Sequence, residues 1–114
     1  KRTYLMGHSM GGGGTMYLGG KYSQYWAALA LLAPALFGST DQLEAIKHIP
    51  IFIAQGDADE LISVDMARRW VARMEELEMT HTYVEIAGGD HVDAIASNAP
   101  LIAQIFDFFD KHSQ

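Results

Sequence analysis

A serine flanked by glycines, Gly7-His8-Ser9-Met10-Gly11, is the feature that most limits how this chain can fold. The segment before it, from Arg2 to Met6, predicts a short strand, and the glycine-rich segment after it can begin a helix. A sharp turn from strand to helix would hold the serine in a strained conformation, with Oγ exposed above the carboxyl end of a sheet. Small residues fit such a turn because the two backbones nearly touch there. The motif therefore predicts a nucleophilic serine on an α/β fold.

The rest of the chain alternates between strand-like and helix-like segments. Strands are expected at 2–6, 26–33, 49–54 and 81–86, and helices at 10–24, 40–47, after Ser63, and after Pro100. Periodicity leaves 26–33 open: its Ala and Leu content favours a helix, whereas its length and position favour a central parallel strand. The alternation predicts a mostly parallel four-stranded sheet with helices on both faces.

Two helices carry further expectations. Gly11 to Gly14 stand in a row at the start of 10–24, and each costs about 1 kcal/mol against alanine inside a helix. Close packing on the sheet can account for one or two of them, and flexibility for the others. In the last helix one apolar face is expected to be buried, made of Ile102, Ile105, Phe106 and Phe109.

Composition narrows the classes of function. The chain has 114 residues, 49% of them apolar and 19% charged, which is typical of one compact globular domain. Its net charge of −6 argues against a nucleic-acid partner or an anionic membrane surface. With no cysteine, the chain cannot form disulfides, use a thiolate nucleophile or bind zinc through Cys. No apolar run approaches the ~20 residues that a membrane span needs.

A serine hydroxyl needs a base to take its proton, and the base needs a carboxylate that orients it. In an open α/β sheet such groups gather in loops beyond the carboxyl ends of the strands. Three of these loops supply Ser9, then Asp57 or Asp59, then His91. The order serine, acid, histidine is the order that folds with this serine turn use. These residues therefore predict a Ser-Asp-His triad.

The sequence resembles the α/β-hydrolase superfamily over nearly all of its length. Segment 7–12 is similar to the serine turn of its esterases and peptidases, 56–59 to its G-x-x-D loop, and 89–91 to its histidine loop. The surrounding segments are most similar to dienelactone-hydrolase and prolyl-oligopeptidase-like serine esterases. The resemblance implies Asp59 as the acid, His91 as the base and the amide of Met10 as one oxyanion donor.

The same resemblance implies that residues 1–114 form a single partial domain, the C-terminal half of an α/β-hydrolase. The second oxyanion donor would then belong to an N-terminal half that this chain lacks. Strand 2–6 would be an open edge, so we expect association through Arg2 to Met6 with that missing half or with a second copy. The connection from 26–33 to 40–47 is too short to hold a lid, which favours a small soluble ester as substrate over a lipid interface.

Several residues have competing interpretations. Asp57 is the alternative acid, and Asp90 and Asp93 lie too close to His91 in sequence to orient it. His8 is expected to point away from the serine and to pack. Asp57 and Asp59 have no third ligand at metal spacing, so we expect neither a metal nor a cofactor.

Three functions remain open at this stage. The first is hydrolysis of carboxylic esters through an acyl-enzyme. The second is a serine peptidase or amidase of the prolyl-oligopeptidase type, which uses the same triad. The third is a non-catalytic module with this fold.

Overall fold

The computed structural model describes residues 3–36, 38–92, 95 and 98–112. Four strands form one sheet, in which every neighbouring pair is parallel and the order is the order of the chain. They are β1 (Tyr4–His8), β2 (Ala28–Leu32), β3 (Ile51–Gly56) and β4 (His81–Ile86). The four-stranded parallel sheet predicted from the alternation is confirmed, and the ambiguous segment 26–33 contains a strand.

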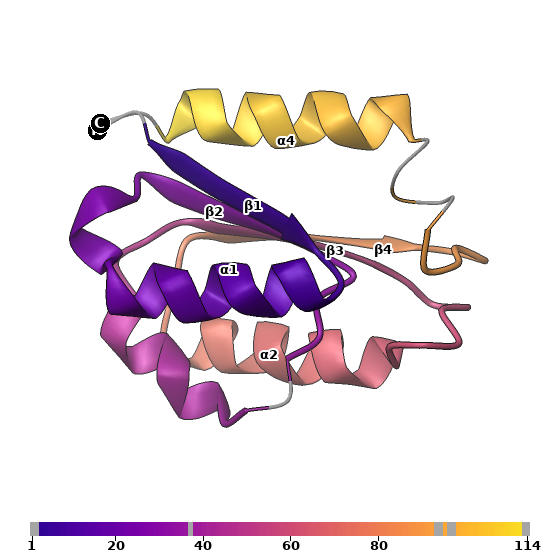
Figure 1. Cartoon of the computed structure of the whole chain (residues 1–114), viewed down its shortest axis with the longest axis horizontal. Coiled ribbons are helices and arrows are strands. Elements are labelled where there is room, and N and C mark those ends of the chain that lie inside the picture. Colours follow the sequence, from indigo (N-terminus) through magenta and orange to yellow (C-terminus); the bar gives the residue numbers. More distant parts are fainter. Residues whose placement is uncertain (1–2, 37, 93–94, 96–97, 113–114) are drawn as a thin grey trace.

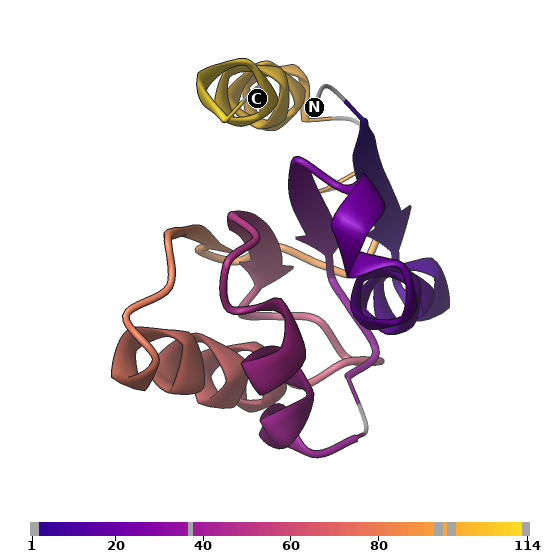
Figure 2. The ribbon, with the colours of Figure 1, turned by 90° about the vertical axis from the view of Figure 1, so that its left-hand side faces the viewer.

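Three α-helices cover the sheet among the described residues, on both faces as predicted (Figure 1). Helices α1 (Met10–Lys21) and α2 (Val64–Glu76) lie on one face, and α4 (Ala99–Lys111) lies alone on the other (Figure 2). Ser63 caps α2, because its hydroxyl accepts a hydrogen bond from the amide of Asp65. None of the described helices is long and apolar enough to cross a membrane.

Some element boundaries differ from the predicted ones. Helix α1 ends at Lys21, and Ser23–Tyr25 is a separate 3₁₀ turn, η1. Segment Thr40–Ile46, η2, is a 3₁₀-helix, the form that short helical connectors often take. Strand β3 begins at Ile51 because Pro50 has no N–H to donate to the ladder.

The core consists of two apolar layers, one on each face of the sheet. Every residue of β2 and β3 is buried, as expected for central strands of a parallel sheet. Leu29, Leu31, Ile51 and Ile53 pack towards α1 and α2 around the fully buried Trp70. The opposite layer joins the sheet to α4 and includes Ala30, Phe52, Ala54, Leu101, Ile105 and Phe108.

The predicted buried face of the last helix is wrong at two positions. Ile102 and Phe106 are 41% and 62% exposed, whereas Leu101 and Phe108 are buried. The sheet covers only one side of α4, and its other side lines an open cavity with Met6 of β1. Helix α4 therefore has two apolar sides, one packed on the sheet and one left exposed beside the edge strand.

Candidate active site

Ser9 occupies the turn between β1 and α1 with a strained backbone. Its φ of 60° and ψ of −119° lie in a region that residues with a side chain seldom adopt. A Cβ on Gly7 would collide with the carbonyl of Gly11 and the hydroxyl of Thr15. Strand and helix thus approach as closely as the glycine pattern predicted, and Ser9 stands at the carboxyl end of the sheet.

His91 lies in the loop after β4 and touches both of its predicted partners. Its Nε2 is 2.7 Å from Ser9 Oγ, and its Nδ1 is 2.6 Å from Asp59 Oδ2. The imidazole is only 11% exposed. An ionised carboxylate can only accept, so Nδ1–H donates to Asp59 and Nε2 accepts from the serine hydroxyl. The structure therefore brings Ser9, His91 and Asp59 into one hydrogen-bonded chain.

The carboxylate of Asp59 is buried and fully engaged, with its side chain 0% exposed. The amides of Leu61 and Ile62 each donate to Oδ1 at 2.8 Å, and Gln55 Nε2 donates to Oδ2 at 3.0 Å. Burial by itself raises the pKa of the Asp59 carboxyl. The hydrogen bonds from Ile62, His91, Leu61 and Gln55 together outweigh it and lower this pKa below its ordinary value. Asp59 is therefore held as an anion beside His91.

The second aspartate of this loop has a different partner. Asp57 Oδ1 accepts from the amide of Gly88 at 2.7 Å, and the amide of Ala58 donates to Gly89 O at 3.0 Å. These bonds join the loop after β3 to the loop after β4. Of the two candidate acids, Asp59 contacts His91 and Asp57 binds the neighbouring backbone.

His8 makes a contact that the sequence does not predict. It packs as expected, but its Nε2 is also 2.7 Å from the carbonyl oxygen of His91, to which it donates. The two rings are also stacked, with centroids 5.1 Å apart. His8 thus joins the end of β1 to the loop that carries His91, across most of the chain.

Gln55 was also missed, although the sequence held a signal. It is the one strongly polar side chain in the apolar strand β3, and it is fully buried. Its Nε2 lies within hydrogen-bond distance of Asp59 Oδ2, Gly56 O and Ile62 O. A buried amide at the end of a strand needs partners, and here one of them is the carboxylate that contacts His91.

Met10 is the first residue of α1, so its amide has no acceptor within the helix. The partial positive charge of a helix N-terminus adds to the attraction of an anion at this amide. Within the described part of the chain, no three His, Asp or Glu side chains lie together as metal ligands would.

Several solved structures have a similar fold over almost the whole of this chain. A thermostable esterase superposes on 97% of the chain with a TM-score of 0.83 at 22% identity, and the match covers 31% of that esterase. SOBER1 from Arabidopsis thaliana matches 96% of the chain with a TM-score of 0.79 at 18% identity, over 52% of its own length. Est1E from Butyrivibrio proteoclasticus matches 95% with a TM-score of 0.76 at 17% identity, over 59% of its length.

No protein-family model matches the sequence, and no curated protein matches it significantly. The chain spans about a third to three-fifths of the solved structures named above. The resemblance inferred from the motifs is confirmed at the level of the fold: the chain has part of the α/β-hydrolase fold.

Proposed function

We propose that this chain is a serine hydrolase that cleaves carboxylic esters through an acyl-enzyme. The proposal rests on one observation, the chain of hydrogen bonds from Ser9 Oγ to His91 at 2.7 Å and from His91 to Asp59 at 2.6 Å. It meets the geometric requirement for a nucleophile, a base and an orienting acid. Esterases among the matched structures favour an ester over an amide as the substrate.

In the first half-reaction Ser9 Oγ attacks the ester carbonyl carbon while His91 Nε2 accepts the hydroxyl proton. The carbonyl π electrons move to the oxygen, and the amide of Met10 donates a hydrogen bond to the resulting oxyanion. Asp59 holds the Nδ1–H tautomer and stabilises the imidazolium. The tetrahedral intermediate then collapses, and the alcohol leaves with the proton from Nε2.

In the second half-reaction water attacks the ester carbonyl carbon on Ser9 while His91 Nε2 takes a proton from that water. The second tetrahedral intermediate has its oxyanion in the same position as the first, so Met10 and Asp59 repeat their roles. Collapse returns the proton from His91 to Ser9 Oγ and releases the carboxylic acid. The enzyme is then ready for another ester.

Covalent labelling tests the nucleophile directly. A fluorophosphonate should label the chain once, and Ser9→Ala should abolish the labelling. Ser39→Ala provides a matched control, because Ser39 is an exposed serine that caps η2 and should leave labelling intact. Equal labelling of the Ser9→Ala variant would overturn the assignment.

Kinetics separate the three functions. With p-nitrophenyl acetate an acyl-enzyme gives a burst of nitrophenol equal to the enzyme concentration. Turnover of the matching p-nitroanilide, in addition to the ester, would instead indicate a peptidase or amidase. A non-catalytic module gives neither labelling nor a burst.

A further inference from the structure

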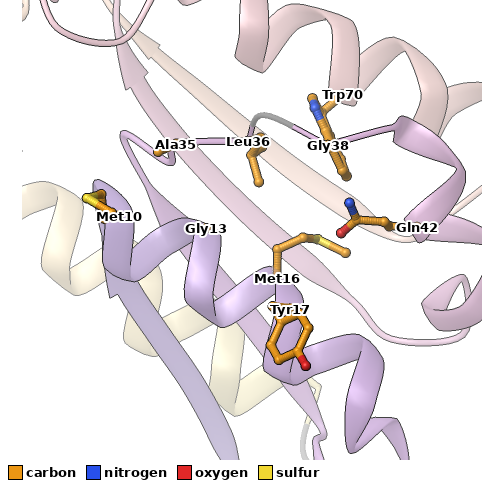
Figure 3. Close-up of a pocket in the computed structure, with 9 residues that line it drawn as sticks. All are labelled: Met10, Gly13, Met16, Tyr17, Ala35, Leu36, Gly38, Gln42 and Trp70. Carbon is orange, nitrogen blue, oxygen red and sulfur yellow. The ribbon is translucent and has the colours of Figure 1, made fainter.

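A cavity of about 240 Å³ lies beside the turn that holds Ser9 (Figure 3). Its walls come from four segments that are distant in sequence: α1, the connection after β2, η2 and α2. The side chains that line it are Met10, Met16, Tyr17, Leu36, Gln42 and Trp70. The proposed mechanism leaves this space without an occupant.

The cavity begins within one residue of the nucleophile. Gly13 and Ala35, which both line it, donate their amide hydrogens to the carbonyl oxygen of Ser9 at 3.2 and 2.9 Å. Met10, whose amide is the proposed oxyanion donor, also lines the cavity, next to Gly13 and Ala35. The cavity thus adjoins the backbone of Ser9, and we expect a group attached to the carbonyl carbon under attack to extend into it.

The position of the cavity relative to His91 determines which part of an ester can enter the cavity. The leaving alcohol must lie against His91 Nε2, because that atom returns a proton to it. The cavity is lined from the α1 and α2 side, and among the described residues neither His91 nor Asp59 lines it. The part of the ester that points away from His91 is the acyl group.

The residues that line the cavity favour an uncharged group as its occupant. Met16, Leu36 and Trp70 are buried and apolar, and no described residue of the lining carries a charge. A carboxylate or ammonium placed there would lose its hydration without gaining a partner of opposite charge among the described lining residues. The flexible thioether of Met16 can adapt to the shape of an alkyl or aromatic occupant. Figure 3 shows the side chain of Met16 turned towards that of Gln42, with the side chain of Leu36 pointing into the space from the opposite wall.

An apolar cavity of about 150 Å³ is large enough for benzene, so about 240 Å³ accepts a larger group. We propose that this cavity is the acyl-binding pocket, and that it takes the acyl part of an uncharged ester of about the size of hexanoyl or phenylacetyl. The inference rests on the proposed function, since it places the acyl group of the same Ser9 ester.

The test narrows the pocket at an exposed position. Gln42→Phe in the 114-residue chain places a ring at the exposed rim of the cavity, and Gln104→Phe, at an exposed position of α4, is the matched control on the other face of the sheet. The measured quantity is kcat/KM for p-nitrophenyl hexanoate divided by kcat/KM for p-nitrophenyl acetate. Gln42→Phe should lower this ratio about ten-fold, within the range that alkyl contacts in a hydrophobic pocket give. Gln104→Phe should leave the ratio as it is.

If acetate and hexanoate are both hydrolysed and Gln42→Phe keeps the wild-type ratio, the pocket assignment is wrong while the proposed function stands. A Gln42→Phe effect that follows the length of the alcohol, with the acyl group fixed as acetyl, would also overturn it.

If neither ester is hydrolysed, the proposed function fails and binding still tests the pocket. Trp70 is one of two tryptophans, so in a Trp26→Phe background its fluorescence reports on the cavity alone. Hexanamide should change that fluorescence saturably, and Gln42→Phe should weaken the response about ten-fold. No response to hexanamide in this background would overturn the inference.

Discussion

The two sides of the proposed site differ in how completely the chain encloses them. On the acid side, Asp59 is buried and receives hydrogen bonds from two amides, a glutamine and His91. On the serine side, β1 pairs only with β2 within the described sheet, and the side chain of Met6 is 49% exposed. The chain thus fixes the acid and the base within itself and leaves the strand that carries the serine at an edge.

This difference has a physical cause. The acid side is built from the carboxyl ends of β3 and β4, which lie side by side in the sheet, and hydrogen bonds between the loops that follow these two strands hold it together. The serine side depends on β1, whose outer edge has no strand beside it among the described residues. The acid side should therefore respond sharply to changes in single side chains, and the serine side to whatever covers its edge.

The largest effect is expected on the acid side. Asp59→Asn removes the carboxylate that fixes the His91 tautomer, and turnover should fall about 10⁴-fold. Asp57→Asn changes a side chain that binds the amide of Gly88, so turnover should fall far less. Steady-state kinetics on one ester compares the two variants. The reverse ranking would mean that Asp57 orients the base.

The Asp59 carboxyl also gives the pH dependence of stability a definite sign. Its pKa is lower in the folded chain than the ordinary value of 3.8, so its ionised form stabilises the fold. That contribution is fully present above pH ~4 and is lost as the pH falls through the folded pKa. The difference in free energy of unfolding between wild type and Asp59→Asn should therefore shrink on acidification. Urea titrations at several pH values measure it, and a difference that grows in acid would contradict the assignment.

The next effect probes the link between the two sides. His8→Phe keeps a ring beside His91 but removes the donor to its carbonyl oxygen. A displaced base can cost about 10²-fold in kcat, whereas KM should change little because His8 is not expected to touch the substrate. His8→Gln, which can still donate, should recover part of the loss. Equal kcat in all three proteins, with unchanged unfolding midpoints, would reduce His8 to a packing residue.

Sequence reasoning was most successful where a short motif or a strong period determines structure. The serine turn, the sheet order and the cap at Ser63 follow from local residue types and from alternation. It failed for His8 and Gln55, because a hydrogen bond between residues far apart in sequence has no local pattern. It also misplaced the buried face of α4. That helix is apolar on two sides, so its own periodicity cannot say which side meets the sheet.

A smaller effect is expected at the edge strand. Ile102 and Phe106 of α4 and Met6 of β1 form an exposed apolar patch beside the edge strand, and Arg2 of the predicted segment lies outside the described residues. We expect the 114-residue chain to pair with a second copy through this edge. Phe106→Lys should weaken the dimer by about 2 kcal/mol, roughly 30-fold in Kd.

Light scattering against concentration measures the association. Tyr17→Lys, an equally exposed aromatic position on α1, is the control and should leave Kd unchanged. A soluble wild-type monomer at micromolar concentration, with native-like amide protection in β1, would refute the pairing.

The smallest single effect is expected within α1, at Gly14, because the glycines of this helix divide into two kinds. A Cβ on Gly12 would lie 2.8 Å from Pro34 Cβ and 3.2 Å from Gly7 O, whereas a Cβ on Gly14 would meet nothing within 4 Å. Gly12→Ala should therefore destabilise the fold by about 1–3 kcal/mol through overpacking. Gly14→Ala should stabilise it by about 0.4–1 kcal/mol, because alanine loses less backbone entropy in a helix. Urea unfolding midpoints at fixed protein concentration give both values. If Gly14→Ala were as destabilising as Gly12→Ala, the outer side of α1 would be a packed surface, and the contrast between an enclosed acid side and an open serine side would be wrong.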